Sequence, residues 1–512
     1  MSSPSAASGR AGPAASGEGG IRALGLTSAT TLVMGSMIGS GIFVVSPEIA
    51  RQVGSPALLM MAWVITAAMT LMGALCYGEL AAALPHAGGQ YVFLRESLGP
   101  LFGFLYGWTL FLVIQTGTIA AVCMAFGKYL GVLYPNAISD THWLVHWGHL
   151  GPVQIGLNTE ELTAIMVIVF LTWVNSRGVK TGAWVQNIFT FAKLAALVAM
   201  ILAGLTAGLV VARQPHVVAA NFHRFWSQFA AAFTGHGLYN LTGASTAKLV
   251  STASIVAVFA AMVGSLFSSD AWNNVTFTAA EVRHPRRNLP LALGLGTLAV
   301  SAIYILVNLA YLSVLPFPAL ATVPEDRVAS AMLGVLYGHA GAALIAVAIL
   351  ISTFGCTNGM VLAGARVYYA MARDRLFFPA AGRLNRARVP ARGLWIQGAW
   401  AGLLCLSGSY SDLLNYVMFA VFLFYILTVA GLFVLRRTQP HLERPYRVVG
   451  YPVVPAVYIG LAVFFDAVVL WVFPQYAGGG LLIVLAGVPV YYAWRPRRNP
   501  AVALHPRAPE PL

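Results

Sequence analysis

The chain has 512 residues, of which 58% are hydrophobic and only 9% are charged, and its mean hydropathy is +0.76. A soluble domain carries about 25% charged residues, so this composition excludes a water-soluble globular protein. The apolar runs are too long for the alternating ten-residue strands of a membrane barrel. They predict an all-α integral membrane protein.

Twelve membrane spans are predicted in chain order after a polar start. Residues 1–20 are rich in Ser, Ala, Gly and Pro and lack the apolar segment of a secretory signal, so we expect a disordered cytoplasmic tail. The predicted spans are residues 26–46, 55–84, 99–132, 160–176, 182–211, 252–279, 288–315, 340–371, 393–408, 411–436, 453–474 and 479–494. We expect a ten-span core over residues 21–440, two further spans over 441–495 and a cytoplasmic tail over 496–512.

The basic residues predict the orientation of these spans. The net charge is +14, and most of the 30 Lys and Arg residues fall in loops that are cytoplasmic when both termini lie inside. This spread of charge follows membrane topology and does not indicate nucleic-acid binding. We therefore expect contacts with membrane lipid and no nucleic-acid partner.

The first span has a weak point at Gly35, Gly39 and Gly41, three glycines within seven residues. A helix interrupted at mid-membrane depth frees backbone N–H groups, and its second half begins with a partial positive charge. Both features attract a carboxylate, so the segment favours a transporter of small anionic or zwitterionic solutes. The alternative is a packing surface between helices formed by Gly35 and Gly39.

The sixth span has its own weak point between Phe267 and Asn274, where Ser, Asp and Asn residues interrupt an apolar run. The first and sixth spans hold the same position in a five-plus-five repeat. Interrupted helices at corresponding positions indicate the binding site of a transporter.

Several ordered motifs resemble those of a known family. They are GSMIGSGIF at 35–43, YGEL at 77–80 with Pro85 and Gly88-Gly89, QNIFTFAK at 186–193, EVRHPRRNLP at 281–290, STFGCTNG at 352–359 and ARVYYAMAR at 365–373. The chain resembles the amino acid–polyamine–organocation superfamily, and within it the bacterial relatives of L-type amino acid transporters. The resemblance covers about residues 21–440. It implies a LeuT-type inverted-repeat fold with broken helices one and six, and amino acid movement by alternating access.

The resemblance also implies roles for residues at the two weak points. The backbone amides of Ser40 and Gly41, next to Gly39, are expected to bind the substrate carboxylate, and the Met37 carbonyl to bind the substrate ammonium. In the sixth span, carbonyls near Ser268 are expected to face the ammonium, with Phe267 as an aromatic lid.

Asp270 departs from the animal L-type pattern, which has glycine at this position, and Ala271 stands where bacterial members often have glycine. The carboxylate of Asp270 could recognise a basic side chain, carry a proton or pair with local N–H groups. The last reading is favoured, because bacterial relatives with this aspartate resemble carriers of neutral amino acids.

Lys193 lies within the apolar fifth span, where an unpaired ammonium costs several kcal/mol. By resemblance it takes the place of the sodium ion that links spans one and eight in Na⁺-coupled members, with Ser352 as its partner. Transport should then be independent of Na⁺, although a buried lysine also leaves proton coupling possible. For Glu79, near the cytoplasmic end of span two, a structural pairing is favoured over a proton relay.

Other site classes find little support in the sequence. His142, His146 and His149 have helical spacing but lie in a predicted outside loop, so we expect no metal site and no cofactor. No catalytic motif indicates an enzyme. A membrane amino acid sensor is a further alternative, but the short predicted tails leave no room for a signalling domain. Residues 133–159 contain no cysteine, so we expect no disulfide-linked heavy chain and a single-chain carrier in a bacterial inner membrane.

Overall fold

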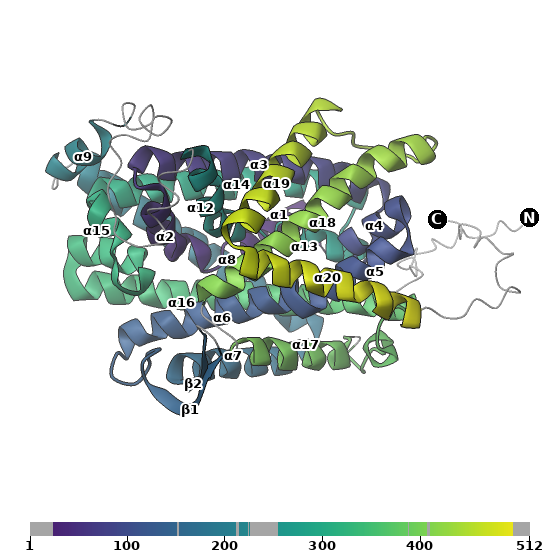
Figure 1. Ribbon diagram of the computed structural model, residues 1–512, viewed down its shortest axis with the longest axis horizontal. Helices are drawn as coiled ribbons and strands as arrows, with labels where there is room; N and C mark the ends of the chain where they lie inside the picture. Colours follow the sequence, from purple (N-terminus) through teal and green to yellow (C-terminus); the bar gives the residue numbers. More distant parts are fainter. Residues whose placement is uncertain are drawn as a thin grey trace, which may run out of the picture.

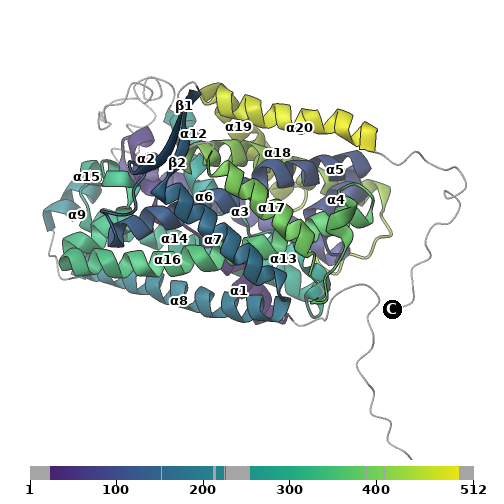
Figure 2. The same cartoon turned by 90° about the horizontal axis from the view of Figure 1, so that it is seen from below.

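The computed structural model describes residues 24–150, 153–210, 215–223, 225, 254–387, 389–406 and 410–494. Its long helices lie side by side along the longest dimension of the molecule (Figure 1), and Figure 2 shows the same helices from below. The two tails predicted at residues 1–20 and 496–512 lie outside the described residues.

The described chain is built almost wholly of helices. The α-helices are α1 (Leu26–Met37), α2 (Val45–Val53), α3 (Pro56–Ala83), α4 (Gln90–Leu98), α5 (Pro100–Thr109), α6 (Gln115–Leu133), α7 (Thr159–Ser176), α8 (Val179–Leu205), α9 (Pro215–Phe222), α12 (Ser254–Ser268), α13 (Asn274–Phe277), α14 (Pro285–Val314), α15 (Phe317–Ala321), α16 (Val328–Arg373), α17 (Ala391–Leu404), α18 (Tyr410–Thr438), α19 (Val453–Val472) and α20 (Pro474–Trp494). Short 3₁₀ or π segments are η1 (Gly41–Phe43), η2 (Leu110–Ile114), η3 (Thr206–Val210), η4 (Ala279–Glu281), η5 (Pro324–Asp326) and η6 (Pro379–Gly382).

Eight helical segments of the described chain are long and apolar enough to cross a membrane. They are Pro56–Ala83, Pro100–Leu133, Phe189–Gly208, Pro285–Val314, Val328–Arg373, Val417–Thr438, Val453–Val472 and Pro474–Trp494. Each falls on one of the predicted spans. The remaining predicted spans, at 26–46, 160–176, 252–279 and 393–408, are also helical but are interrupted, shorter or more polar.

Local sequence explains where individual helices begin and bend. The Asn158 side chain accepts from the Glu161 N–H while the Glu161 carboxylate accepts from the Asn158 N–H, so a reciprocal cap starts α7. In α16, Gly338 has φ 65° and ψ −156°, a conformation that only glycine adopts readily. The helix is therefore broken there, and its long part after Gly338 coincides with the predicted eighth span.

A β-hairpin between α6 and α7 was not expected from the sequence. Strand β1 (Trp143–Leu150) pairs antiparallel with β2 (Val153–Asn158). His146 and His149 lie on β1 and His142 precedes it, so their helical spacing has no structural meaning. The described residues contain no group of His, Cys, Asp or Glu side chains suited to a metal ion.

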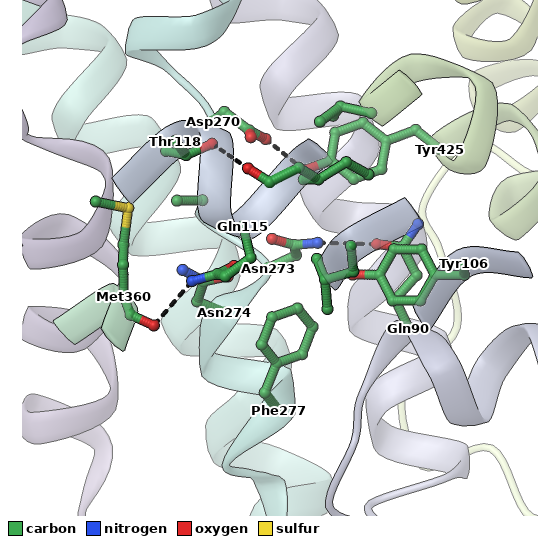
Figure 3. Close-up of a pocket in the computed structure, with 14 residues that line it drawn as sticks. Gln90, Tyr106, Gln115, Thr118, Asp270, Asn273, Asn274, Phe277, Met360 and Tyr425 are labelled. Atoms are coloured by element: carbon green, nitrogen blue, oxygen red, sulfur yellow. Dashed lines mark hydrogen bonds between the residues drawn. The ribbon is translucent and has the colours of Figure 1, made fainter. Parts of the chain in front are cut away.

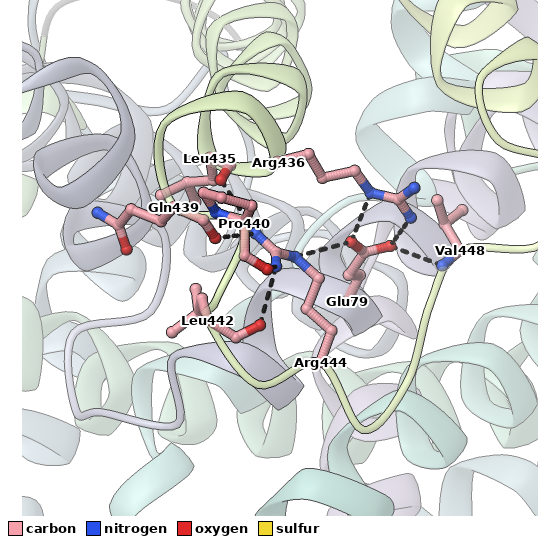
Figure 4. A network of polar contacts seen from close by, with 8 residues as sticks. All are labelled: Glu79, Leu435, Arg436, Gln439, Pro440, Leu442, Arg444 and Val448. Atoms are coloured by element: carbon pink, nitrogen blue, oxygen red, sulfur yellow. Dashed lines mark hydrogen bonds and ion pairs between the residues drawn. The ribbon is translucent and has the colours of Figure 1, made fainter.

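Glu79 joins the end of α3 to α18 and to the chain that follows it. Arg436 donates to both carboxylate oxygens, from Nε at 2.8 Å and from a terminal nitrogen at 2.6 Å, and the Val448 N–H donates at 2.7 Å. Arg444 approaches the same carboxylate at 3.6 Å (Figure 4). Glu79 is 1% exposed, so the predicted structural pairing is confirmed. Arg444 also donates to four carbonyls at and after the end of α18, those of Leu435, Gln439, Pro440 and Leu442.

Candidate functional site

The helix of the first predicted span is interrupted where its glycines lie. Helix α1 ends at Met37, and the chain resumes a helical path only at η1, which begins at Gly41, before α2 begins at Val45. In a continuous helix each carbonyl accepts a hydrogen bond from the N–H group four residues later. The break removes these N–H partners, so the carbonyls next to it need other donors. The surrounding helices supply these donors from their side chains.

Lys193 and Ser352 meet at the end of α1. The Lys193 ammonium on α8 donates to the Gly35 carbonyl at 2.5 Å and to the Ile38 carbonyl at 2.7 Å. The Ser352 hydroxyl on α16 makes longer contacts, 3.4 Å each, with the carbonyls of Ile38 and Gly39. Lys193 is 1% exposed and Ser352 is fully buried. The Lys193 ammonium and the Ser352 hydroxyl therefore both approach the Ile38 carbonyl.

Helix α14 supplies two tyrosine donors to the same segment. The Tyr304 hydroxyl lies 3.0 Å from the Met37 carbonyl and 3.1 Å from the Ser268 carbonyl, and its single proton serves one of them at a time. The Tyr311 hydroxyl donates to the Ile42 carbonyl at 3.2 Å. Tyr304 thus bridges the two interrupted helices.

Two further side chains donate hydrogen bonds to carbonyls at the first break. The Cys356 thiol on α16 donates to the Ser36 carbonyl at 3.2 Å, and the Tyr129 hydroxyl on α6 donates to the Phe43 carbonyl at 2.6 Å. A Cβ atom added at Gly39 would lie 3.2 Å from the Cys356 sulfur, so glycine allows α1 to approach α16 here.

The second interruption lies directly against the first. Helix α12 ends at Ser268, and α13 begins at Asn274. A Cβ atom added at Gly41 would lie 2.1 Å from the Ser268 Oγ and 2.8 Å from its Cβ, which is closer than side-chain atoms can pack. Only glycine therefore fits between the two breaks. Phe267 is buried, and its carbonyl accepts from the Asp270 N–H at 3.1 Å.

Asp270 lies within the second break and is 8% exposed. Its carboxylate accepts a 2.5 Å hydrogen bond from the Tyr425 hydroxyl on α18. Ala271 follows with φ 62°, in the left-handed region that costs an L-residue roughly 1–2 kcal/mol. The turn is thus shaped for glycine but is occupied by alanine.

A small cavity adjoins this second break on the α13 side. It is lined by residues that include Asp270, Asn274, Gln115 and Tyr425, and in Figure 3 the side chains of Gln115 and Asn274 lie next to each other. Gln115 donates to the Met360 carbonyl at 2.8 Å. The cavity volume is about 20 Å³, room for one or two waters, because one water needs about 10–15 Å³. An amino acid could enter only after the helices move apart.

The structure brings the predicted site residues together around the two breaks. Tyr304 and Tyr425 were not predicted, because a tyrosine in an apolar span is equally consistent with core packing. One signal was available for α14. Its polar residues Thr297, Ser301, Tyr304, Asn308 and Tyr311 recur at helical spacing, which places them on one face.

The model of the amino acid permease family matches residues 24–488 of the chain. The chain belongs to this family. It is 30% identical over 489 residues to the large neutral amino acids transporter small subunit 2 of Mus musculus. This alignment covers 94% of the chain and 82% of that relative.

Two further relatives of the permease span most of its length. It is 30% identical over 479 residues to the serine/threonine exchanger SteT of Bacillus subtilis, with 93% of the chain and 97% of the relative covered. It is 28% identical over 430 residues to the b(0,+)-type amino acid transporter 1 of Mus musculus, with 83% and 78% covered. The family predicted from the motifs is confirmed.

Proposed function

We propose that this permease carries neutral L-amino acids across the cytoplasmic membrane by alternating access, as an exchanger or facilitator, without Na⁺. The observation that carries the proposal is the direct contact of two helix breaks at Gly41 and Ser268, bridged by the Tyr304 hydroxyl. Its relatives in mouse and Bacillus subtilis are named as a transporter of large neutral amino acids and as a serine/threonine exchanger.

The proposed binding mode uses backbone groups at the breaks. The N–H groups of Ser40 and Gly41 lie where the second half of the first helix begins, and this positive end suits a carboxylate. The carbonyls of Met37 and Ser268 lie at the ends of α1 and α12, where a partial negative charge suits an ammonium. Substrate would displace the Tyr304 hydroxyl from them, and Phe267 would close over the site.

The proposed architecture has twelve spans with a five-plus-five inverted repeat and both termini in the cytoplasm of a bacterial cell. In this arrangement α1 with α2 and α12 with α13 are the two broken helices, and α19 and α20 stand outside the repeat. We also propose that no heavy chain is disulfide-linked, because residues 133–159 contain no cysteine and all four cysteines are buried.

Counterflow of radiolabelled amino acid into proteoliposomes tests the proposal. Unlabelled L-leucine inside should drive uptake, whereas N-acetyl-leucine and leucine methyl ester should neither drive it nor compete, because each lacks one of the two charges. A protein that binds leucine but gives no flux would be a sensor. Equal competition by the blocked analogues would contradict the proposed site.

The second candidate function is transport of cationic amino acids or coupling to protons through Asp270. Its carboxylate is buried and lines the cavity, and in the described part of the chain no basic side chain forms an ion pair with it. The Asp270→Asn variant separates the two functions, because asparagine can still accept from Tyr425. We expect neutral uptake to survive with modest loss. Selective loss of lysine and arginine uptake would instead establish the cationic function.

A further inference from the structure

Asp466 is a carboxylate within a membrane-spanning helix that none of the preceding roles uses. It lies inside α19, and at 1.5 Å per residue roughly 9 Å of helix separates it from the end at Val472. It is 8% exposed. Both carboxyl oxygens are buried and have no hydrogen-bond partner among the described residues.

Two other buried carboxylates have partners. Glu79 receives a bidentate pair from Arg436, and Asp270 receives the Tyr425 hydroxyl. An ionised carboxylate without a donor or a cation costs several kcal/mol or more in an apolar surrounding, so such a group normally takes up a proton.

The two residues before Asp466 in α19 pack against aromatic side chains of neighbouring helices. Phe464 packs edge-on against Phe259 of α12 at 4.8 Å between ring centroids, and Phe465 packs against Phe422 of α18 at 4.8 Å. Among described side chains, α12 presents no titratable or charged group toward α19. On the other helices packed against α19, and on α19 itself, these groups are Cys76, Tyr77 and Glu79 of α3, Tyr425, Arg436 and Arg437 of α18, Tyr476, Tyr491 and Tyr492 of α20, and Tyr458 of α19. Tyr425 is committed to Asp270 and Arg436 to Glu79, and none of the group forms a hydrogen bond or ion pair with Asp466.

We propose that Asp466 is a proton-binding site in the membrane interior, occupied by a proton in this packed state. As a neutral acid it can lie in the seam between α19, α12 and α18. Release of the proton would leave a bare charge in that seam, so water or a cation would have to enter and the helices would have to separate.

The site is placed to affect the second break. Helix α12 ends at Ser268, and α18 carries the Tyr425 that holds Asp270. Because the protonated form is the one that fits the packed state, stability falls as pH rises through the ionisation of Asp466. The asparagine variant is neutral at every pH and should lack this fall.

Labelling of the full-length purified protein with dicyclohexylcarbodiimide tests the first part. A protonated carboxyl adds its O–H across one C=N bond to give an O-acylisourea, which rearranges to a stable N-acylurea with no leaving group and no redox change. Peptide mass spectrometry should find the adduct on Asp466, decreasing as pH rises and lost in Asp466→Asn. Glu79 is also buried but is ion-paired with Arg436, and it should remain unlabelled. Labelling of Glu79 without Asp466 would overturn the proposal.

Thermal unfolding in detergent, which needs no transport, tests the second part. The wild type should unfold at a lower temperature than Asp466→Asn at high pH, and the difference between the two unfolding temperatures should grow as pH is raised. A difference between the two proteins that stays constant with pH would overturn the proposal. Neither readout depends on the transported substrate, so the proton site and the proposed transport function can fail separately.

Discussion

At the scale of single residues, the two breaks depend on Gly41 having no side chain. A methyl group at this position would overlap the Ser268 Oγ and Cβ, at 2.1 and 2.8 Å. The clash acts directly between the two segments proposed to hold the substrate. The position is therefore sensitive to any increase in volume, even though it carries no chemistry of its own.

We expect Gly41→Ala to weaken substrate binding and Gly41→Leu to abolish it. Overpacking costs about 1–3 kcal/mol, which corresponds to a roughly 5- to 150-fold loss of affinity. Binding can be measured by scintillation proximity on purified protein. Gly460→Leu is the matched control, because nothing lies within 4 Å of a Cβ atom there.

The double variant Gly41→Ala/Ser268→Gly should recover part of the binding, because it removes the Ser268 side-chain atoms that collide. Normal uptake by Gly41→Leu would remove the first break from the proposed site. Failure of the double variant to improve on Gly41→Ala would show that Ser268 is not the colliding partner.

Lys193→Ala should lower the rate of turnover much more than the apparent affinity for substrate. The change leaves the Gly35 carbonyl without its donor and the Ile38 carbonyl with only the long Ser352 contact. A buried carbonyl without a donor costs about 1–3 kcal/mol. If this cost falls on only one conformation of the transport cycle, the equilibrium between conformations shifts, and the exchange rate should fall roughly tenfold. Initial rates of exchange at several substrate concentrations measure both quantities.

Lys128→Ala is the corresponding control, since the ammonium of Lys128 on α6 forms no hydrogen bond with the described residues of either break. An increase in KM with unchanged turnover in Lys193→Ala would mean that the ammonium contacts substrate, contrary to the proposed role.

At the scale of helices, the C-terminal end of α3 is held to α18 by charge. Glu79 is 1% exposed and paired with Arg436, whereas the pair of Arg286 with Glu443 has side chains that are 47% and 69% exposed. The two pairs share the same chemistry but differ in burial. Their energetic contributions should differ accordingly.

Glu79→Gln should lower the free energy of unfolding by about 3–5 kcal/mol, because removing one partner of a buried pair leaves the other uncompensated. Glu443→Gln should change it by less than about 1 kcal/mol, as for other exposed pairs. Thermal unfolding of both variants in one detergent measures the difference. Equal effects would show that the Glu79 pair does not hold these helices together.

The helix breaks, and the need of the buried Lys193 ammonium for a partner, could be anticipated because each involves a local conflict in the sequence. The pairing of Lys193 with Ser352 was implied only by the resemblance to the family. Glycines and polar residues oppose an apolar helix, and an ammonium opposes hydrocarbon. Tyr304 and Tyr425 could not be anticipated, because a phenol is compatible with both core and polar contacts until its neighbours are known. The hairpin at Trp143–Asn158 was not anticipated, because the segment between two apolar spans was predicted only as an outside loop.

At the scale of the whole molecule, the proposed mechanism needs the two broken helices to change their packing together. The narrow cavity beside Asp270 and the contacts at Gly41 and Lys193 describe one closed arrangement. In the proposed mechanism the ammonium of Lys193, which donates to the Gly35 and Ile38 carbonyls, takes the place of a sodium ion, so the packed arrangement forms without one.

The central claim, exchange that does not need Na⁺, is tested most directly by counterflow in proteoliposomes with Na⁺ replaced by K⁺ or choline at constant pH. The initial rate of neutral amino acid exchange should be the same in all three media, and should remain so in the wild type at every substrate concentration. A steep dependence of that rate on Na⁺ would show that Lys193 does not substitute for the ion, and would contradict the account.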